Sequence, residues 1–411
     1  MKEQKLPTGS KFTVLRQLCN YIPPHLVPKL ARETGVEEQW RTFSPWSHVV
    51  SLSYGQLAHS IGLNDVCDAL QLNSGPLSAI RGATPPTRNN LSHANKVRDA
   101  ALAEQLFWEV FKYLGDLSPK FVSGKAGKRF ARRFKRTIHL VDSTTIQLIA
   151  SCLDWAKHRR RKAAAKCHLR LNLQSFLPRF AIIDTARDAD AKRAREVCAG
   201  IQEGEIVIFD KAYVDFDHLY ELASRGVVWV TRAKDNMQAN VLEPLPLKAG
   251  GKIISDELIE LKTPSSRKAY PEIMRRIVAW VEVDGQERLM TFITNQLTWS
   301  AESVAELYRC RWSIEVFFKQ IKQTLQLCDF LGTSANAVRW QVWTALLVYL
   351  LLRYLAFLTN WAHSFNRLFT LARTGLWRKW DLLSLLQRYG TAGGHFRYLG
   401  RPEQAYFPGF V

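Results

Sequence analysis

The stretch that decides the fold is YRCRWSIEVFFKQIK, residues 308–322. Its pattern predicts a helix with one apolar side, formed by Ile314, Phe317, Phe318 and Ile321. A second set recurs at steps of three or four residues, which places its members on one stripe: Tyr308, Arg311, Glu315, Lys319 and Lys322. One carboxylate therefore lies among four groups suited to phosphate. This pattern indicates a metal ligand beside a nucleic-acid backbone rather than a solvated face with alternating charges.

The composition fits a nucleic-acid partner. The chain has 411 residues, which suggests two or three domains, and its net charge of +20 favours nucleic acid over a membrane. The seven cysteines form no CxxC pair, so neither a zinc ribbon nor a disulfide framework fits, and a reducing, cytoplasmic compartment follows. The longest apolar run, Val342–Leu352, is too short to span a bilayer and predicts a buried helix.

Two acids follow apolar strands elsewhere in the chain. Asp142 comes after Ile138–Val141, and Asp210 comes after Ile206–Phe209. Sites in α/β sheets form at the carboxyl ends of strands, so both acids can converge there with Glu315. Three carboxylates in one cleft repel each other and require a cation, and their oxygens suit Mg²⁺ or Mn²⁺. Two such ions can activate an attacking oxygen and stabilise the leaving oxygen of a phosphodiester.

The rest of the chain divides by its periodicity. Residues 12–115 show helical spacing, whereas residues 227–295 are rich in strands. The segment Thr87–Arg98 predicts a capped helix with a basic face, either part of a helix-turn-helix-like DNA reader or part of a bundle without DNA contacts. A second group either lines a DNA channel or forms a solvated face: Lys157, Arg160, Lys166 and His168.

Together these motifs resemble the DDE transposases of the insertion-sequence-four family of bacterial mobile elements. The family signature is Tyr, two residues, Arg, three residues, Glu, six residues, Lys, which stands here as Tyr308, Arg311, Glu315 and Lys322, with the frequent extra Lys at Lys319. VDST at residues 141–144 is similar to the first-Asp motif, and FDKAY at residues 209–213 is similar to the second. The likeness covers residues 135–360.

The resemblance implies an α/β fold, with a ribonuclease H-like catalytic core, a β-rich insertion and an all-helical N-terminal domain. The expected division runs as follows: residues 1–118 form the helical N-terminal domain, a candidate binder of terminal-repeat DNA; residues 119–212 form the first part of the core; residues 213–299 form the β-rich insertion; residues 300–360 form the rest of the core with the signature helix; and residues 361–411 form a C-terminal helical region.

The resemblance also assigns roles. It implies that Asp142, Asp210 and Glu315 are the catalytic residues and the ligands of two Mg²⁺ ions, for which Mn²⁺ can substitute. It implies DNA contacts to terminal phosphates from four residues of the signature: Tyr308, Arg311, Lys319 and Lys322. Lys211 and Arg232 join the expected DNA-binding set, one beside the second Asp and one at a strand end.

One departure from the family concerns base stacking. Some relatives place on the strand before the signature helix a Trp that stacks on a flipped base. This chain has Met290 there, and Trp280 and Trp299 lie nearby but out of register. The stacking residue is therefore unassigned.

The function that the resemblance implies is cut-and-paste DNA transposition. Metal-activated water would nick one strand at the element end, and the freed 3′-hydroxyl would attack the opposite strand and later the target. The partners would be double-stranded DNA, as terminal inverted repeats and target, and a second copy in a homodimer on DNA. The expected location is the bacterial cytoplasm, on the nucleoid when bound to DNA. Two alternatives stay open: a ribonuclease H-like nuclease without strand transfer, and a DNA-binding derivative that has lost catalysis.

Overall fold

The computed structural model describes residues 7–36, 42–124, 134–148, 157–159, 162–185, 190–247, 251–283, 286–325 and 331–388. The chain forms two compact units. Unit 1 takes Met1–Val122, Ile146–Ala165 and Phe318–Val411, and unit 2 takes Ser123–Thr145 and Lys166–Phe317. The division into five domains that the resemblance implies stays a prediction.

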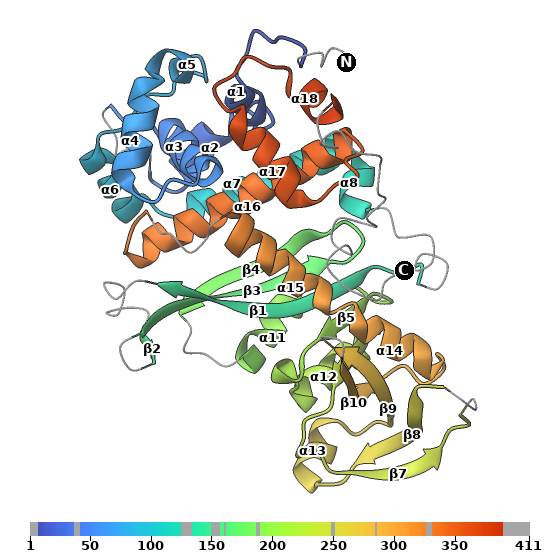
Figure 1. Cartoon of the computed structure of the whole chain (residues 1–411). Helices are drawn as coiled ribbons and strands as arrows, with labels where there is room; N and C mark the ends of the chain where they lie inside the picture. The colour runs from blue at the N-terminus through green and yellow to red at the C-terminus, as the bar shows by residue number, and fades with distance from the viewer. Residues whose placement is uncertain are drawn as a thin grey trace. The chain divides into compact units, whose positions relative to one another are not determined.

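The N-terminal part of unit 1 is helical, as the sequence predicts (Figure 1). Its helices are α1 (Val14–Cys19), α2 (Leu26–Glu33), α3 (Pro45–Ala58), α4 (Leu63–Leu72), α5 (Ser74–Ser78), α6 (Arg88–Val97), α7 (Ala101–Leu117) and α8 (Pro119–Ser123). Hydroxyl side chains define several starts: Ser44 accepts a hydrogen bond from the Ser47 amide, and Thr87 accepts one from the Asn90 amide. The capped helix predicted after Thr87 is confirmed, whereas its role toward DNA stays open.

The C-terminal part of the chain completes unit 1. The long helix α16 (Ala335–Leu358) packs against α3, α6 and α7, and it is followed by α17 (Phe365–Thr374) and α18 (Leu382–Arg388). By length and composition α16 could cross a membrane, but most of its side chains are buried among the helices of unit 1. The buried helix predicted from the run Val342–Leu352 is confirmed.

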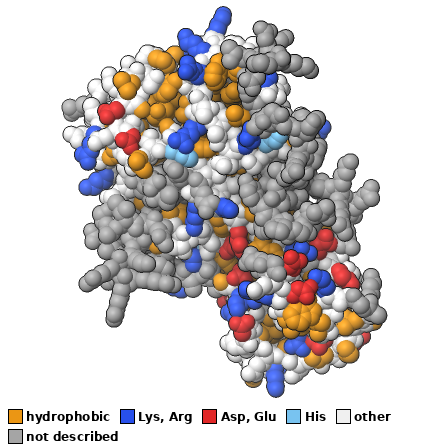
Figure 2. Space-filling view, in the orientation of Figure 1, with side chains coloured by type: hydrophobic (Ala, Val, Ile, Leu, Met, Phe, Trp, Pro, Cys, Tyr) orange, Lys and Arg blue, Asp and Glu red, His pale blue; other side chains and the backbone are white. Residues whose placement is uncertain are grey.

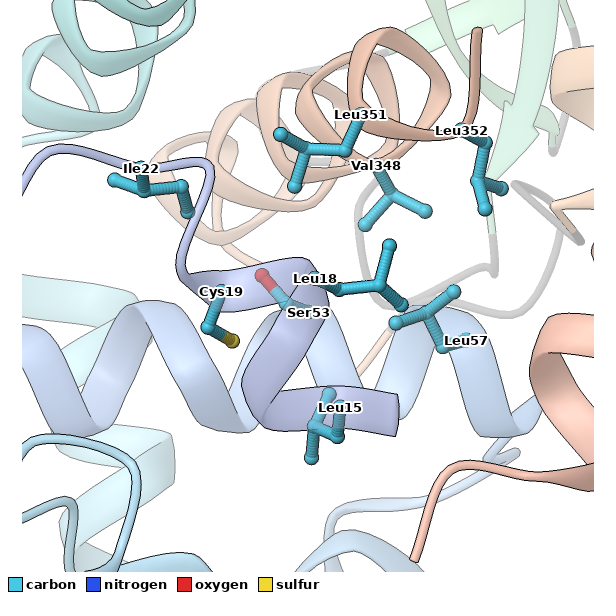
Figure 3. A pocket seen from close by; sticks show the side chains of 9 residues that line it. All are labelled: Leu15, Leu18, Cys19, Ile22, Ser53, Leu57, Val348, Leu351 and Leu352. Atoms are coloured by element: carbon cyan, nitrogen blue, oxygen red, sulfur yellow. The ribbon is translucent and has the colours of Figure 1, made fainter. Parts of the chain in front are cut away.

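A small cavity lies among α1, α3 and α16 (Figure 3). Aliphatic side chains form most of its wall, and Cys19 and Ser53 are the two exceptions. This lining carries no charged group, so it lacks the set of acids, bases or phosphate-binding groups that a catalytic site requires.

The sheet, most of whose residues belong to unit 2, positions the acids. Its strands are β1 (Ile138–Leu148), β3 (Lys162–Asn172), β4 (Leu177–Thr185), β5 (Ile206–Phe209), β6 (Val228–Arg232), β7 (Ala239–Pro244), β8 (Ile253–Leu261), β9 (Met274–Val283) and β10 (Gln286–Thr294). They pair in the order β3-β1-β5-β6-β10-β9-β8-β7, and β4 pairs with β3. The short β2 (Lys157–Arg159) pairs with the first residues of β3.

Two kinds of pairing divide this sheet. Strands β1, β5 and β6 are parallel neighbours, whereas β6, β10, β9, β8 and β7 are joined by antiparallel pairs. The first group, extended by β3 and β4, gives the five-strand order of a ribonuclease H-like core, and the antiparallel group is the β-rich insertion. The fold class that the resemblance implies is therefore confirmed.

Helices α11 (Asp190–Cys198) and α12 (Phe216–Ser224) contribute to the core of unit 2. Their Val197 and Leu219 belong to one buried cluster with Val141, Phe209 and Trp229 of the parallel strands. Asp215 caps α12 by accepting a hydrogen bond from the His218 amide. Val141 and Phe209, the residues directly before the two acids, are thus held in a packed core.

The insertion has a mixed surface. Figure 2 shows acidic side chains interspersed with basic ones in the part of unit 2 that carries β7 to β10, around an exposed apolar patch. Trp280 and Leu289, which pair across β9 and β10, are exposed by 41% and 52%. Met290, at the position where some relatives carry Trp, is buried instead and points into the unit. No residue is thereby assigned to base stacking.

Candidate active site

The two strand acids lie at the same level of the sheet. The parallel register of β1 and β5 ends with the pair Val141 and Phe209, and Asp142 and Asp210 are the next residues on each chain. Asp210 leaves its strand as predicted and precedes a 3₁₀ turn at Lys211–Tyr213. Asp142 does not end its strand, because β1 continues to Leu148; the sequence prediction was wrong on this point. The pairing of β1 with β5, however, ends just before Asp142.

The signature segment forms two helices rather than the single helix that its periodicity predicts. Helix α14 (Ala301–Arg309) ends before Cys310, and α15 (Trp312–Lys319) begins after Arg311. At the junction the amides of residues 311, 313 and 314 bond to carbonyls three residues back instead of four. The two helices are therefore joined by a tight turn of the 3₁₀ type rather than by continuous α-helix. A π-helical turn, η4 (Gln320–Thr324), follows α15, so the predicted single stripe is broken twice.

The apolar side of the signature is buried as predicted. Ile314, Phe317, Phe318 and Ile321 are all less than a tenth exposed. On the other side, Tyr308 lies in α14, Arg311 in the junction and Glu315 in the first turn of α15. The burial of one side therefore survives the break, and the polar residues of the junction are left to face the strand acids.

Arg311 joins two of the predicted acids. Its Nη1 donates to Asp142 Oδ2 at 2.9 Å, and its Nη2 donates to Glu315 Oε1 at 2.8 Å. The Arg311 side chain is 12% exposed and that of Asp142 is 17% exposed, whereas Glu315 is 52% exposed. The pair with Asp142 is thus largely shielded from water, and the pair with Glu315 extends to the surface.

Tyr308 reaches the third acid. Its hydroxyl donates to Asp210 Oδ1 at 3.2 Å, and its ring packs 4.9 Å from that of Phe292 on β10. Burial raises the pKa of Tyr308, and the nearby Asp210 raises it further, so the phenol keeps its proton. The segment 308–315 therefore supplies a hydrogen-bond donor to both strand acids and carries the third acid itself.

Burial dominates the electrostatics of Asp142. The pKa of this carboxyl is raised to about 6, chiefly by burial, while Arg311 and the Ser143 amide act in the opposite direction. The charges of Asp210 and Glu315 contribute to the increase, so all three acids interact. Burial by itself lowers the pKa of Arg311, but Tyr308 and Asp142 outweigh it and raise that pKa. A cation beside Asp142 therefore stabilises the ionised form of its carboxyl group.

The donor set fits a hard divalent cation in its chemistry, because it consists of carboxylate oxygens. Among the described residues, no three His, Cys, Asp or Glu side chains lie in an arrangement that could already hold a metal ion. Between Asp142 and Glu315 lies the guanidinium of Arg311, which binds one oxygen of each carboxylate.

The other predicted DNA-binding residues have varied surroundings. Lys211 pairs with the exposed Asp235 at 2.8 Å, and Arg232 ends β6, opposite Phe292 of β10. The charge of Arg232 acts on the pKa of Tyr308, which places its guanidinium near the signature. Lys319 ends α15 and is exposed, and Lys322 lies in the π-helical turn. These two lysines belong to unit 1, whereas the acids belong to unit 2.

Of the second basic group, Arg160 and the side chain of Lys157 lie outside the described residues. His168 is buried, and its Nδ1 is 3.1 Å from the Tyr213 hydroxyl, so neither a channel wall nor a solvated face describes it. Sequence reasoning missed two contacts of the site: Phe292 behind Tyr308, and Asp235 beside Lys211. The alternation of β10 could have marked Phe292 as inward-facing, but nothing local pairs Lys211 with Asp235.

Comparisons with known proteins identify the family of the chain. The family model described as "Transposase DDE domain" matches residues 133–351, and a "Domain of unknown function (DUF4372)" matches residues 10–80. A "Putative transposase y4zB" of Sinorhizobium fredii is 30% identical over 326 residues, which is 78% of this chain and 86% of that protein.

Two further relatives are similar over shorter spans. A "Probable transposase for insertion sequence element IS5377" of Geobacillus stearothermophilus is 28% identical over 55% of this chain and 59% of its own length. The "Transposase InsG for insertion sequence element IS4" of Escherichia coli is 26% identical over 45% of this chain and 42% of its own length. Because the DDE domain spans more than half of the residues, the chain belongs to the DDE transposases, within the insertion-sequence-four family.

Proposed function

We propose that this DDE transposase moves an insertion sequence by a metal-dependent cut-and-paste reaction. Its substrates are the double-stranded terminal inverted repeats of the element and a target duplex. Strand cleavage at the element ends exposes 3′-hydroxyls, which then join to the target. Membership of a family of DNA-cleaving and strand-transferring enzymes supports this proposal.

The observation that supports the proposal is the set of contacts between the signature segment and the strand acids: Arg311 links Asp142 to Glu315, and Tyr308 donates to Asp210. Two of the three acids follow the last register pair of neighbouring parallel strands, and the third reaches Asp142 through a shared arginine. Two Mg²⁺ ions bound by these oxygens, or Mn²⁺ in their place, would supply Lewis-acid stabilisation to both oxygens of the phosphodiester exchange. In this proposal Asp142, Asp210 and Glu315 are the catalytic ligands.

The remaining residues of the site position the DNA. Arg311 can clamp a phosphate with two donors, whereas Lys319 and Lys322 act as point charges along the backbone. Tyr308 orients the Asp210 carboxylate through its hydroxyl, and its proposed contact with a terminal phosphate would require this buried side chain to become accessible. Lys211 and Arg232 extend the basic surface on either side of Asp210 and β6.

The test uses the inverted repeats that flank the reading frame as a labelled duplex, with Mg²⁺ and the full chain. The wild-type protein should nick the duplex at the repeat end. Asp142→Asn should keep DNA binding and reduce nicking by at least about a thousandfold, because it removes a ligand that acts only on the chemical step. Asp217→Asn is the matched control, since it makes the same change at an exposed acid of α12. Loss of nicking in both variants, or in neither, argues against the proposed ligand set.

A ribonuclease H-like nuclease without strand transfer is the second candidate. It would use the same acids, so nicking alone does not separate the two. A strand-transfer assay separates them: pre-cleaved repeat ends are incubated with a supercoiled target, and only a transposase joins the 3′-hydroxyl to the target. The antiparallel insertion between β6 and α14 and the helical N-terminal region favour transposition. An inactive DNA-binding derivative would bind the repeats and nick them no better than Asp142→Asn.

The assembly follows from the reaction. Two element ends must be held at once, so we infer a homodimer on DNA, acting in the bacterial cytoplasm on the nucleoid. Light scattering of the complex with repeat-end duplex should give two chains per two ends. A complex of one chain with one end that still completes strand transfer would remove the need for a dimer.

A further inference from the structure

Arg311 has an environment that differs from that of a DNA-contacting side chain waiting in solvent. The residue lies in the tight junction between α14 and α15, and its side chain is 12% exposed. Its two terminal nitrogens each reach a different carboxylate, Asp142 at 2.9 Å and Glu315 at 2.8 Å. A guanidinium carbon 5.8 Å from the centre of the Tyr308 ring completes the enclosure. Arg311 is therefore already engaged with the acids of the proposed metal site.

Arg311 and a divalent cation would compete for the same two carboxylates. Asp142 and Glu315 would hold the cation in the proposed site, and one oxygen of each already accepts from Arg311. A guanidinium that stayed between them would face a second positive charge at ligand distance in a partly dehydrated site, which is strongly unfavourable. Without either cation, two carboxylates would be left facing each other.

One hydrogen-bond donor of Arg311 is not used by the bridge between the two acids. Its Nε is buried and has no hydrogen-bond partner among the described residues, and an unmet donor of this kind costs free energy. The bridge is therefore not the best arrangement available to this side chain. A phosphodiester offers oxygens in the spacing that a guanidinium binds with two parallel hydrogen bonds, so it can draw Arg311 away from the acids.

We propose that Arg311 is the resident counter-ion of Asp142 and Glu315 in the DNA-free protein and yields these oxygens to the divalent cation when a DNA phosphate takes its guanidinium. This inference rests on the proposed ligand set. It makes Arg311 a positioning residue for metal loading, in addition to its proposed phosphate contact. Because binding free energies are reciprocal, DNA should tighten metal binding by the same factor by which metal tightens DNA binding. The free chain is thereby kept from holding a reactive metal site in the absence of its substrate.

The test measures Mn²⁺ binding to the full chain without DNA, from the electron paramagnetic resonance signal of free Mn²⁺. Arg311→Gln should bind Mn²⁺ roughly tenfold more tightly than wild type, a factor typical of coupling between two ligands. Arg311→Lys should lie between them, because an ammonium is a point charge that cannot bridge two carboxylates with one planar fork. Adding Asp142→Asn to Arg311→Gln should abolish the gain in Mn²⁺ affinity.

Arg193→Gln is the matched control. Arg193 also bridges two carboxylates, those of Asp184 and Glu196, within the same unit but outside the site. Its replacement removes the same charge and the same number of ion pairs. It should leave the Mn²⁺ affinity at the wild-type value. An equal gain in Arg193→Gln would assign the effect to net charge and overturn the inference.

The outcomes separate this inference from the function proposed above. Equal Mn²⁺ affinities of wild type and Arg311→Gln, both dependent on Asp142, overturn the counter-ion role and leave the metal site standing. Absence of Asp142-dependent Mn²⁺ binding in every variant, with and without repeat-end duplex, overturns the ligand set itself. If circular dichroism shows that the Arg311 variants do not fold, the test uses the wild-type chain alone, with and without DNA. Its Mn²⁺ affinity must rise when repeat-end duplex is added, and no rise contradicts the proposal.

Discussion

Tyr308 has two contacts that substitutions can separate. Its ring packs against Phe292 of β10, and its hydroxyl donates to Asp210. The ring contact is a matter of burial, since Tyr308 is 1% exposed, whereas the hydroxyl acts on the carboxylate of the site. The signature tyrosine thus ties α14 to the sheet and orients one acid at the same time.

We expect Tyr308→Phe to lower the free energy of unfolding by about 1.5–3 kcal/mol, the contribution of a hydrogen bond to a charged group. Tyr308→Ala should cost about 3–5 kcal/mol, because it also empties the space beside Phe292. Urea denaturation in the presence of a chelator measures both, with Tyr113→Phe as a control on a more exposed phenol. A cost of Tyr308→Phe equal to that of Tyr308→Ala would show that the hydroxyl, not the ring, holds α14 in place.

The elements show where sequence patterns suffice. Apolar runs ending in an acid located β1 and β5, and the spacing of large apolar residues located the buried side of α15. These patterns are local, because strand and helix periods are properties of consecutive residues. The break between α14 and α15 was not predicted, since neither proline nor glycine marks it. It is a tertiary feature, in which Tyr308 and Arg311 both meet carboxylates from the sheet.

The same limit applies to polar contacts inside the insertion. Arg275 of β9 and Asp256 of β8 form a buried pair, with Nε to Oδ1 at 2.7 Å and Nη2 to Oδ2 at 2.5 Å. Both side chains are at most 5% exposed, and Arg275 also donates to the carbonyls of Leu297 and Trp299. Alternation of strand residues does not reveal this pair, because both charges occupy inward positions that the pattern assigns to apolar side chains.

Arg275→Met should therefore destabilise the fold by about 3–5 kcal/mol, because Asp256 is left as a buried charge without a partner. The double variant Arg275→Met with Asp256→Leu should regain a large part of this loss, since neither charge then remains. Thermal and urea unfolding of the two variants measure the difference. The exposed pair Lys252 and Glu287 on β10 is the control, and Lys252→Met should change stability by less than about 1 kcal/mol. A double variant less stable than Arg275→Met would contradict the argument.

At the scale of the chain, unit 1 joins residues from both ends of the sequence. His48 of α3 illustrates this, since its ring is 4.3 Å from that of Trp340 in α16 and its Nε2 is 2.8 Å from Asn95 Oδ1 in α6. Helical spacing predicts each helix separately, but the pairing of α3 with α16 depends on contacts across nearly three hundred residues. The sequence predicts the helices of unit 1, whereas the union of the two ends is visible only in the structure.

The burial of His48 predicts acid sensitivity. Burial, with a smaller contribution from the charge of Arg98, lowers the pKa of His48 to about 3. The folded state thus binds fewer protons than the unfolded state, whose histidine pKa is about 6.5, so stability is lost as the pH falls below that value. His48→Gln should cost stability at pH 7 and lose less on acidification. The difference in free energy of unfolding between wild type and His48→Gln should narrow by up to about 1.4 kcal/mol per pH unit below 6.5. Urea unfolding at pH 7 and pH 5.5 checks this, and a constant gap would contradict it.

The excess of positive charge over the whole chain, +20, predicts DNA binding that weakens steeply with salt. The proposal assigns part of this excess to phosphate contacts from Lys319 and Lys322, which follow Glu315 along the signature. Each lost phosphate contact should reduce the slope of log affinity against log salt by about 0.9, so Lys319→Gln with Lys322→Gln should reduce it by about 2. Lys262→Gln with Lys268→Gln removes the same charge from exposed positions of the insertion. Fluorescence anisotropy across a salt series should show an unchanged slope for this control. Equal slopes for both double variants would mean that the signature lysines act through net charge and touch no phosphate.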